Sequence, residues 1–420
     1  MVNISSLAKR LRDLPPKRII LSGPSGFLGS RVLDCIINIH NDRIKHGLKP
    51  GEVVLLSAGP GKLMKNLVNR HGEDSMKFIR ASRADYYTQH SAEVWRDHLG
   101  SLGLEGSDSV FINLAALAGP RADNRTAMVD VNYKAPVAAA KACESLGFGH
   151  WIQSSTFATF TERAAQVQYS RGKAMCDFSL CTMKELPVTI ACLSLLYCKS
   201  DGVLGQDGDK LNLVDLANLP LTPILGSGTA PLQPQEVMDA AQRIAFLACS
   251  DPAIRPQGRR LRSQAASPRA RFYDATGPQE LSMLEVLEKF ARYNGNRSFR
   301  PAHVDYKNME RMLNVASMGN LNRQFISLLR SEQQDSVKPV LGKPFVWEGL
   351  LGPDSSLITL DEAMALTELG YRERRSFPYY NTLKWIYQNP GVIVPGIMIF
   401  FEALLSFVRK GRAVLPPESK

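Results

Sequence analysis

The sequence contains no pair of cysteines at the CxxC spacing of zinc and redox motifs. It has seven cysteines, an odd number, and no cluster of histidines accompanies them. These absences argue against a structural zinc site and favour a reducing compartment, with most of the cysteines as small core residues. The seven are Cys35, Cys143, Cys176, Cys181, Cys192, Cys198 and Cys249.

A secretory signal peptide is also absent, and the segment up to Arg18 has a single acidic residue, Asp13. Its basic residues are Lys9, Arg10, Arg12, Lys17 and Arg18, and its apolar helical face holds Ile4, Leu7, Leu11 and Leu14. A basic, amphipathic and acid-poor segment is typical of a mitochondrial presequence. The alternative is an ordinary surface helix that leads into the first strand of a cytoplasmic protein.

The composition lacks any bias away from that of globular proteins. The 420 residues are 44% hydrophobic and 22% charged, with a net charge of +11, so one large domain with extensions or two domains are expected. Basic residues cluster only between Arg255 and Arg271, without interleaved aromatics. We expect a solvated surface insertion there, with contact to a polyanion or a membrane surface as the alternative, and no nucleic-acid partner.

The stretch Ile19 to Arg31 predicts a nucleotide-binding turn. An apolar run ends in Gly23, two more glycines follow at the spacing GxxGxxG, and a helical apolar periodicity then begins. Gly23 would allow the turn, Gly26 would let a phosphate approach the backbone, and Gly29 would let the helix pack on the strand. The candidate binding residues are Gly23, Ser25, Gly26, Phe27, Leu28, Gly29 and Arg31. A purely structural turn is the alternative.

The same glycine spacing recurs at Gly100, Gly103 and Gly106, but there it comes before an apolar run. A nucleotide turn needs a strand before the glycines and a helix after them. We therefore interpret the second copy as a loop.

An acidic residue is missing where NAD-binding proteins usually have one, at the end of the second strand. The strand Val53 to Ser57 runs instead into Ser57 and, five positions on, Lys62. Together with Arg31, these residues suit a ribose phosphate, so NADP(H) is favoured over NAD(H). The alternative is that Lys62 is simply a surface lysine.

Strand and helix patterns alternate along the chain, which predicts an α/β fold with a doubly wound parallel sheet of the Rossmann type. Further strands are expected at 76–79, 110–116, 151–156 and 188–196. Ala115 and Ala116 leave room for a cofactor, and Asn132 falls near the start of the following helix. The expected divisions are 1–16 as a possible targeting segment, 17–295 as the nucleotide-binding domain, 296–388 as a smaller α-rich C-terminal part, and 389–420 as an apolar tail.

Tyr169 and Lys173 lie four positions apart, so a helix would place them on one face. An ammonium beside a phenol lowers the phenol's pKa and makes it a usable acid or base. A hydroxyl from Ser154, Ser155 or Thr156 would polarise a substrate carbonyl, which suits hydride transfer. Tyr380 and Lys384 share the spacing, but no nucleotide turn lies near them.

These motifs together resemble an extended short-chain dehydrogenase/reductase of the NAD-dependent epimerase/dehydratase type, over roughly residues 17–295. Tyr169 follows Thr156 by only 13 positions, which is similar to an atypical branch, the nucleotide-binding accessory subunit of mitochondrial respiratory complex I. The segments 223–241 and 272–287 also resemble that branch. The resemblance implies a tightly held NADP(H), partners among the other subunits of a large mitochondrial membrane complex, and a location on the matrix side of the inner membrane.

The chain departs from the family at the end of the sixth strand, beside the expected nicotinamide position. Ser194 and Tyr197 remain, but the usual Arg, Pro and Gly are replaced, and Leu196 is the candidate cofactor contact. Two functions therefore stay open. The first is an accessory subunit that holds the nucleotide for structural stability. The second is an active oxidoreductase, epimerase or sterol-type dehydrogenase that uses Tyr169 and Lys173.

The C-terminal tail contains the most apolar stretch of the chain, residues 391–408, with Glu402 as its one charge. Aromatic residues precede the stretch and basic residues follow it, as where a chain meets a bilayer interface. We expect contact with a membrane surface through 389–412, with a spanning segment or burial in the fold as alternatives.

Overall fold

The computed structural model describes residues 4–304, apart from 87–88, 118–124, 161–167, 198–216, 218–221, 226, 230, 253–254, 256–257, 259, 261–265 and 294–298. The chain divides into two compact units. The first takes in the described residues of 4–194 and 235–278, and the second those of 195–234 and 279–304. The expected divisions at 16, 295 and 388 stay predictions.

The first unit is built on a sheet of seven parallel strands in the order β11-β6-β5-β4-β1-β2-β3. The strands are β1 (Arg18–Ser22), β2 (Val53–Ser57), β3 (Ile79–Arg83), β4 (Ser109–Asn113), β5 (His150–Thr156), β6 (Val188–Leu193) and β11 (Ala270–Ala275). The strand order reverses between β1 and β4, and this switch point is where doubly wound sheets bind ligands. The predicted doubly wound sheet is confirmed.

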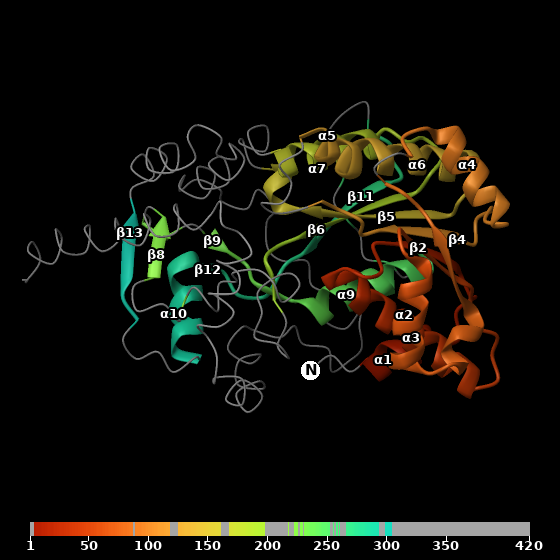
Figure 1. Ribbon diagram of the computed structural model, residues 1–420, viewed down its shortest axis with the longest axis horizontal. Coiled ribbons are helices and arrows are strands. Elements are labelled where there is room, and N and C mark those ends of the chain that lie inside the picture. The colour runs from red at the N-terminus through yellow and green to blue at the C-terminus, as the bar shows by residue number, and fades with distance from the viewer. Residues whose placement is uncertain are drawn as a thin grey trace, which may run out of the picture. The chain divides into compact units, whose positions relative to one another are not determined.

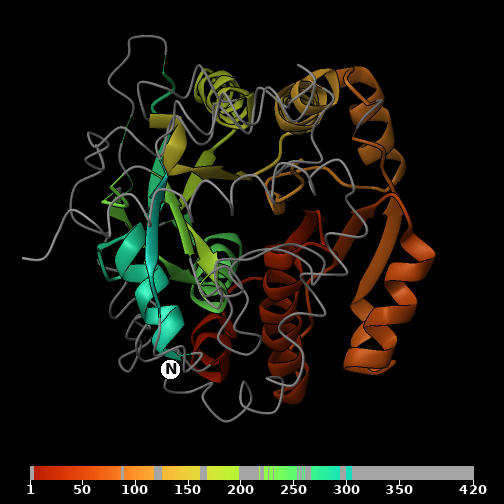
Figure 2. The same cartoon turned by 60° about the vertical axis from the view of Figure 1, so that its left-hand side comes forward.

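Helices cover both faces of this sheet (Figure 1). One face carries α1 (Ile4–Leu11), α2 (Phe27–Lys45), α3 (Pro60–His71) and α9 (Val237–Cys249), and the other carries α4 (Ala92–Ser101), α5 (Arg125–Val129), the π-helical η2 (Asp130–Lys134), α6 (Ala135–Ser145) and α7 (Gln168–Cys181). The turned view in Figure 2 shows the same two layers of helices. Because both faces are covered, strands β1, β2, β4 and β6 are apolar for most of their length.

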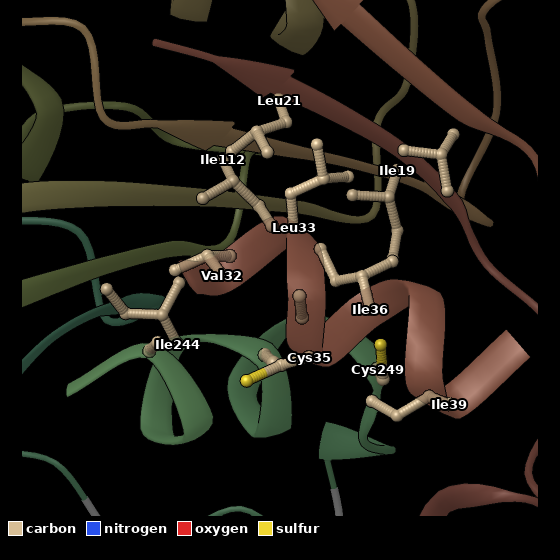
Figure 3. Packing of buried hydrophobic residues seen from close by; sticks show 14 of the residues in the cluster. Ile19, Leu21, Val32, Leu33, Cys35, Ile36, Ile39, Ile112, Ile244 and Cys249 are labelled. Carbon is tan, nitrogen blue, oxygen red and sulfur yellow. The ribbon is translucent and has the colours of Figure 1, made fainter. Parts of the chain in front are cut away.

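The apolar side chains form two buried clusters, one on each face of the sheet. In the first, Figure 3 shows Leu33 of α2 lying between Ile112 and Ile19 of the strands. On the same helix, Val32 lies beside Ile244 of α9 (Figure 3). The six described cysteines are all buried thiols, as expected for small core residues.

The N-terminal helix α1 belongs to this first cluster. Its Leu7 and Leu11 are buried against α2 and α9. The guanidinium of Arg43 on α2 holds the segment that follows, donating to the carbonyl oxygens of Arg12 and Leu14. The predicted amphipathic helix is therefore confirmed, and its apolar face packs in the fold.

Several expected boundaries were wrong. Residues 76–78 belong to a 3-10 helix, η1 (Asp74–Phe78), where the Met76 nitrogen donates to the Glu73 carbonyl at 2.9 Å, and β3 begins only at Ile79. The fourth strand ends at Asn113 rather than Ala116.

The sixth strand ends at Leu193 rather than Leu196, since its neighbours β5 and β11 pair with it only as far as that residue.

Two expected loops also differ in part. Gly100 lies in the last turn of α4, whereas Gly103 and Gly106 have positive φ and start no helix.

In the basic cluster between Arg255 and Arg271, Arg260 is exposed. Arg255 instead donates to the Ser250 carbonyl, and burial lowers its pKa to about 10, so the cluster is not uniformly solvated.

The second unit contains short strands and one described helix of more than one turn. They are β7 (Leu196–Tyr197), β8 (Thr222–Leu225), β9 (Pro231–Leu232), β12 (Leu281–Ser282), α10 (Met283–Tyr293) and β13 (Pro301–Val304). The short strand β10 (Gln235–Glu236) belongs to the first unit. Strand β8 pairs with β13 in parallel, and β9 pairs with β12 antiparallel.

The predicted C-terminal helices and the apolar tail 389–420 lie outside the described residues. Within the described part of the chain, no helix has the length and apolar character needed to cross a membrane.

We predict that Leu7→Ala lowers the free energy of unfolding by ~2–5 kcal/mol, because it removes a fully buried side chain from the α1–α2–α9 contact. Lys9→Ala, on the exposed side of the same helix, is the control and should change stability by less than ~0.5 kcal/mol. Urea unfolding of both variants tests this. Equal stability of the two would mean that α1 does not contribute to the core.

Candidate active site at the carboxyl ends of the strands

The β1–α2 turn is held by close backbone contacts that only glycine permits. Gly23 has φ of 69°, and a Cβ on it would lie 2.8 Å from the Ala115 nitrogen at the end of β4. A Cβ on Gly29 would lie 1.9 Å from the carbonyl oxygen of Gly23. The expected roles of Gly23 and Gly29 in the turn and in helix packing are therefore confirmed.

Helix α2 begins with its N-terminus uncapped by any side chain. Gly26 is the N-cap residue, no side-chain cap bond is formed, and the first turn has no acidic residue. The first helical bond runs from the Ser30 nitrogen to the Gly26 carbonyl at 2.9 Å. The N–H groups of Phe27, Leu28 and Gly29 thus lack a carbonyl one turn earlier, and Ser25 and Gly26 are exposed beside them. Such a helix start suits a phosphate.

The residues expected at a ribose phosphate lie around the end of β2 and on α2. Ser57 ends β2, and its hydroxyl accepts from the Gly59 nitrogen at 3.2 Å. Lys62 is exposed on the first turn of α3. Arg31 is half-buried and lies 3.8 Å from Asp34, a carboxylate that also pairs with Arg70. The charge of Arg31 is therefore partly offset within the protein, whereas Lys62 has its ammonium in solvent.

The chain after β4 is fixed by Asn132. This side chain accepts from the Leu117 nitrogen at 2.8 Å and donates to the Leu117 carbonyl at 2.9 Å. Asn132 lies in the π-helical turn η2, and Gly172 of α7 packs on it closely enough that an added Cβ would be 3.3 Å away. The predicted small residues just before this clamp differ in burial, with Ala115 half-buried and Ala116 exposed.

A row of buried polar side chains links the ends of the central strands. Ser22 of β1 donates to Asn113 of β4 at 2.6 Å, and Asn113 donates to Gln153 of β5 at 2.9 Å. The Gln153 amide then donates to the Ser154 carbonyl at 2.9 Å. We call Ser22, Asn113 and Gln153 the amide ladder. The sequence analysis missed it, although two amide residues at the ends of apolar strands were a visible signal.

Lys173 of α7 is buried and reaches the end of β5. Its Nζ donates to the Ser154 carbonyl at 2.8 Å and lies 3.5 Å from the Ser154 hydroxyl. Burial lowers the pKa of Lys173, and the nearby Asp177 carboxylate opposes that shift. The structure therefore brings together Lys173 and Ser154, two residues of the predicted set, and adds a carboxylate that was not predicted.

Asp177 is a buried acid one helical turn beyond Lys173. The hydroxyl of Ser155 donates to its Oδ2, while its Oδ1 has no hydrogen-bond partner among the described residues. Burial raises the pKa of Asp177 to about 7, against the effects of the Ser155 bond and the Lys173 charge. Because the Ser155 proton is directed at Asp177, Ser154 and Thr156 are the better placed of the three predicted hydroxyls.

Tyr169 lies half-buried in the first turn of α7, on the same helix as Lys173. Burial, and then the Asp177 carboxylate, raises the pKa of its phenol to about 12. The pattern of Tyr169 and Lys173 predicted a lowered pKa, and that prediction was wrong. Burial dominates at the phenol, and the Nζ of Lys173 is bonded to the Ser154 carbonyl.

Leu196 and the pair Tyr380 and Lys384 were also named from the sequence. Leu196 is a half-buried residue of β7 in the second unit. Tyr380 and Lys384, the pair with the same spacing as Tyr169 and Lys173, lie outside the described residues. Among the side chains that the structure describes, no group of three or more His, Cys, Asp or Glu could hold a metal ion.

No protein-family model matches the sequence, and no match is found among curated proteins. Similar folds occur among solved structures. A thiolation-reductase di-domain from an archaeal non-ribosomal peptide synthetase has a TM-score of 0.56 at 14% identity, over 89% of this chain and 80% of that one. A dTDP-glucose 4,6-dehydratase from Streptomyces venezuelae with NAD bound has a TM-score of 0.53 at 15% identity, over 86% and 98%.

Pal from Bacillus thuringiensis has a TM-score of 0.52 at 14% identity, over 85% of this chain and 99% of that one. At identities this low, the likeness establishes a shared Rossmann-type α/β fold.

We predict that Gly29→Ala lowers the free energy of unfolding by at least ~2 kcal/mol, because its Cβ would collide with the Gly23 carbonyl. Gly61→Ala is the matched control, since nothing lies within 4 Å of a Cβ at that position in α3. It should be neutral or slightly stabilising. Denaturant unfolding of both variants checks this, and an unaffected Gly29→Ala protein would contradict the described turn.

We predict that the wild type loses about 3 kcal/mol of stability relative to Asp177→Asn as pH rises from about 4.5 to 7.5. The folded-state pKa of about 7 lies above the unfolded value, so the folded carboxyl holds its proton longer and contributes stability mainly at low pH. Other groups titrate in both proteins and cancel in the difference. Urea unfolding across this range tests the prediction, and parallel curves would contradict it.

Proposed function

We propose that this chain is an NAD(P)-dependent oxidoreductase or epimerase of the short-chain dehydrogenase/reductase type. The observation that carries the proposal is the position of Lys173 and Ser154 at the carboxyl end of β5, in the same sheet whose β1–α2 turn ends in an uncapped helix. The fold shared with a dTDP-glucose 4,6-dehydratase solved with NAD supports a nicotinamide nucleotide as the ligand.

A nicotinamide nucleotide bound at the turn would supply or accept the hydride. The N–H groups of Phe27 to Gly29 would hold its phosphates, and Lys173 would hold its ribose. Ser154 or Thr156 would bind the substrate oxygen and Tyr169 would move the proton. A phenol with a pKa of about 12 stays protonated near neutral pH. It is therefore better suited to donate a proton to a carbonyl oxygen than to remove one from a hydroxyl.

NADP(H) is the proposed nucleotide. Strand β2 ends in Ser57 without an acidic residue, and the Lys62 ammonium lies in solvent at the start of the next helix. A cation at this position favours a ribose phosphate, which an acidic residue would repel. Arg31 adds less to this preference because Asp34 lies 3.8 Å from it.

A second candidate is the nucleotide-holding accessory subunit of mitochondrial complex I. The observations that favour it are in the sequence: the short interval of 13 positions between Thr156 and Tyr169, and the replaced residues around Ser194 and Tyr197. Partners in a large mitochondrial membrane complex, a matrix location and a membrane contact through 389–412 belong to this proposal.

We predict that the purified protein binds NADPH more tightly than NADH, and that Lys62→Glu weakens NADPH binding about tenfold while leaving NADH binding unchanged. Lys65→Glu, an exposed lysine on the same helix, is the matched control for a general charge effect. Fluorescence titration with each nucleotide measures both affinities. Failure of the wild type to bind either nucleotide would overturn the proposed function.

The two candidates are separated by turnover. Nucleotide oxidation with a panel of carbonyl compounds and nucleotide-activated sugars should disappear in Tyr169→Phe while NADPH binding persists, if the chain is an enzyme. No turnover by the wild type, combined with migration in a large complex on native gels of mitochondria, would favour the accessory subunit instead.

A further inference from the structure

The amide ladder forms a continuous path of hydrogen bonds beneath the proposed site. It starts at Ser22, whose hydroxyl also accepts from the Leu114 and Ala115 nitrogens at 3.2 and 3.3 Å. It crosses β4 at Asn113 and β5 at Gln153, and it ends on the Ser154 carbonyl. That same carbonyl oxygen accepts the bond from Lys173. The path therefore joins Ser22, the residue before Gly23, to the Ser154 carbonyl that accepts from Lys173.

The burial of the ladder makes these bonds costly to break. Ser22, Asn113 and Gln153 have no exposed surface at all. A buried amide without a partner is strongly unfavourable, and an apolar residue would suffice if these positions only filled the core. Each amide in the ladder can therefore hold its orientation only while its neighbours hold theirs.

The geometry at Ser154 explains how the ladder acts on Lys173. The carbonyl oxygen has two lone pairs, one facing the Gln153 amide at 2.9 Å and one facing the Lys173 Nζ at 2.8 Å. The Gln153 bond is a second donor to the peptide oxygen that Lys173 uses, in addition to the pairing of β5 with β6 at Ser154 and Ser155. Without it, this oxygen loses a donor that helps to orient the acceptor of Lys173.

We propose that Asn113 and Gln153 are positioning residues that hold Lys173 in register with the nucleotide turn, so that the turn and Lys173 bind the nucleotide as one unit. This inference rests on the proposed function, in which the nucleotide contacts both. It deepens that function by assigning a role to two side chains that do not themselves touch the nucleotide.

A double-mutant cycle with NADPH as the probe tests the proposal. Lys173→Met should weaken NADPH binding about tenfold in the wild type, but by less than about threefold once Gln153→Met is present. Gln153→Met alone should weaken binding about fivefold. Methionine matches the length of glutamine, corresponds to lysine without its terminal ammonium, and removes the hydrogen bonds of both.

Thr189→Val is the matched control. Thr189 makes an equally buried bond of 2.8 Å to His150, at the opposite, amino ends of β5 and β6. Its loss should lower stability in the manner of a ladder variant but leave NADPH affinity and the effect of Lys173→Met unchanged. A merely structural role for Gln153 would give the same pattern as this control.

The outcomes are distinct. Independent effects of Gln153→Met and Lys173→Met, in a protein that binds NADPH, would overturn the ladder's role and leave the proposed function intact. If the wild type binds neither NADPH nor NADH, the proposed function and this inference both fail. If Gln153→Met does not fold, Asn113→Leu/Gln153→Met leaves no amide alone in the ladder and takes its place in the cycle.

Discussion

The site depends on the contact of three backbone segments at the β1–α2 turn. The Gly23 carbonyl faces the start of α2 at Gly29, and Gly23 itself lies against the chain at Ala115. No side chain fits between them, so strand β1, helix α2 and the end of β4 have fixed relative positions. This contact brings the uncapped N-terminus of α2 to the switch point of the sheet.

The charged groups at the end of β5 are more than a pair of one tyrosine and one lysine. Lys173 is buried, with Ser154 as its acceptor and Asp177 as the opposing charge. A buried charge requires such partners, because desolvation otherwise disfavours its charged form. The same carboxylate raises the pKa of Tyr169, and Ser155 is turned toward it. The pKa of Tyr169 is therefore raised first by burial and then by a carboxylate eight positions along its own helix.

Sequence patterns were sufficient for features that depend on neighbours along the chain. The spacing of Gly23 and Gly29 predicted the turn, because the steric requirement for glycine is local to that turn. The alternation of strands and helices predicted the sheet, since apolar periodicity follows from burial on one or two faces. The predicted bounds of the third strand were wrong because Ser75 and its neighbours form a 3-10 turn that the apolar pattern did not reveal.

Partners that are distant in sequence required the tertiary structure. Ser22 and Asn113 are 91 positions apart, and Asn113 and Gln153 are 40 apart. Nothing local indicates that their side chains meet, because the order of strands in the sheet decides it. The sequence by itself determined the turn, the parallel sheet and the candidate pair of Tyr169 and Lys173. Only the tertiary structure decided which side chains are partners in charge interactions and hydrogen bonds, because burial and pairing depend on contacts across strands.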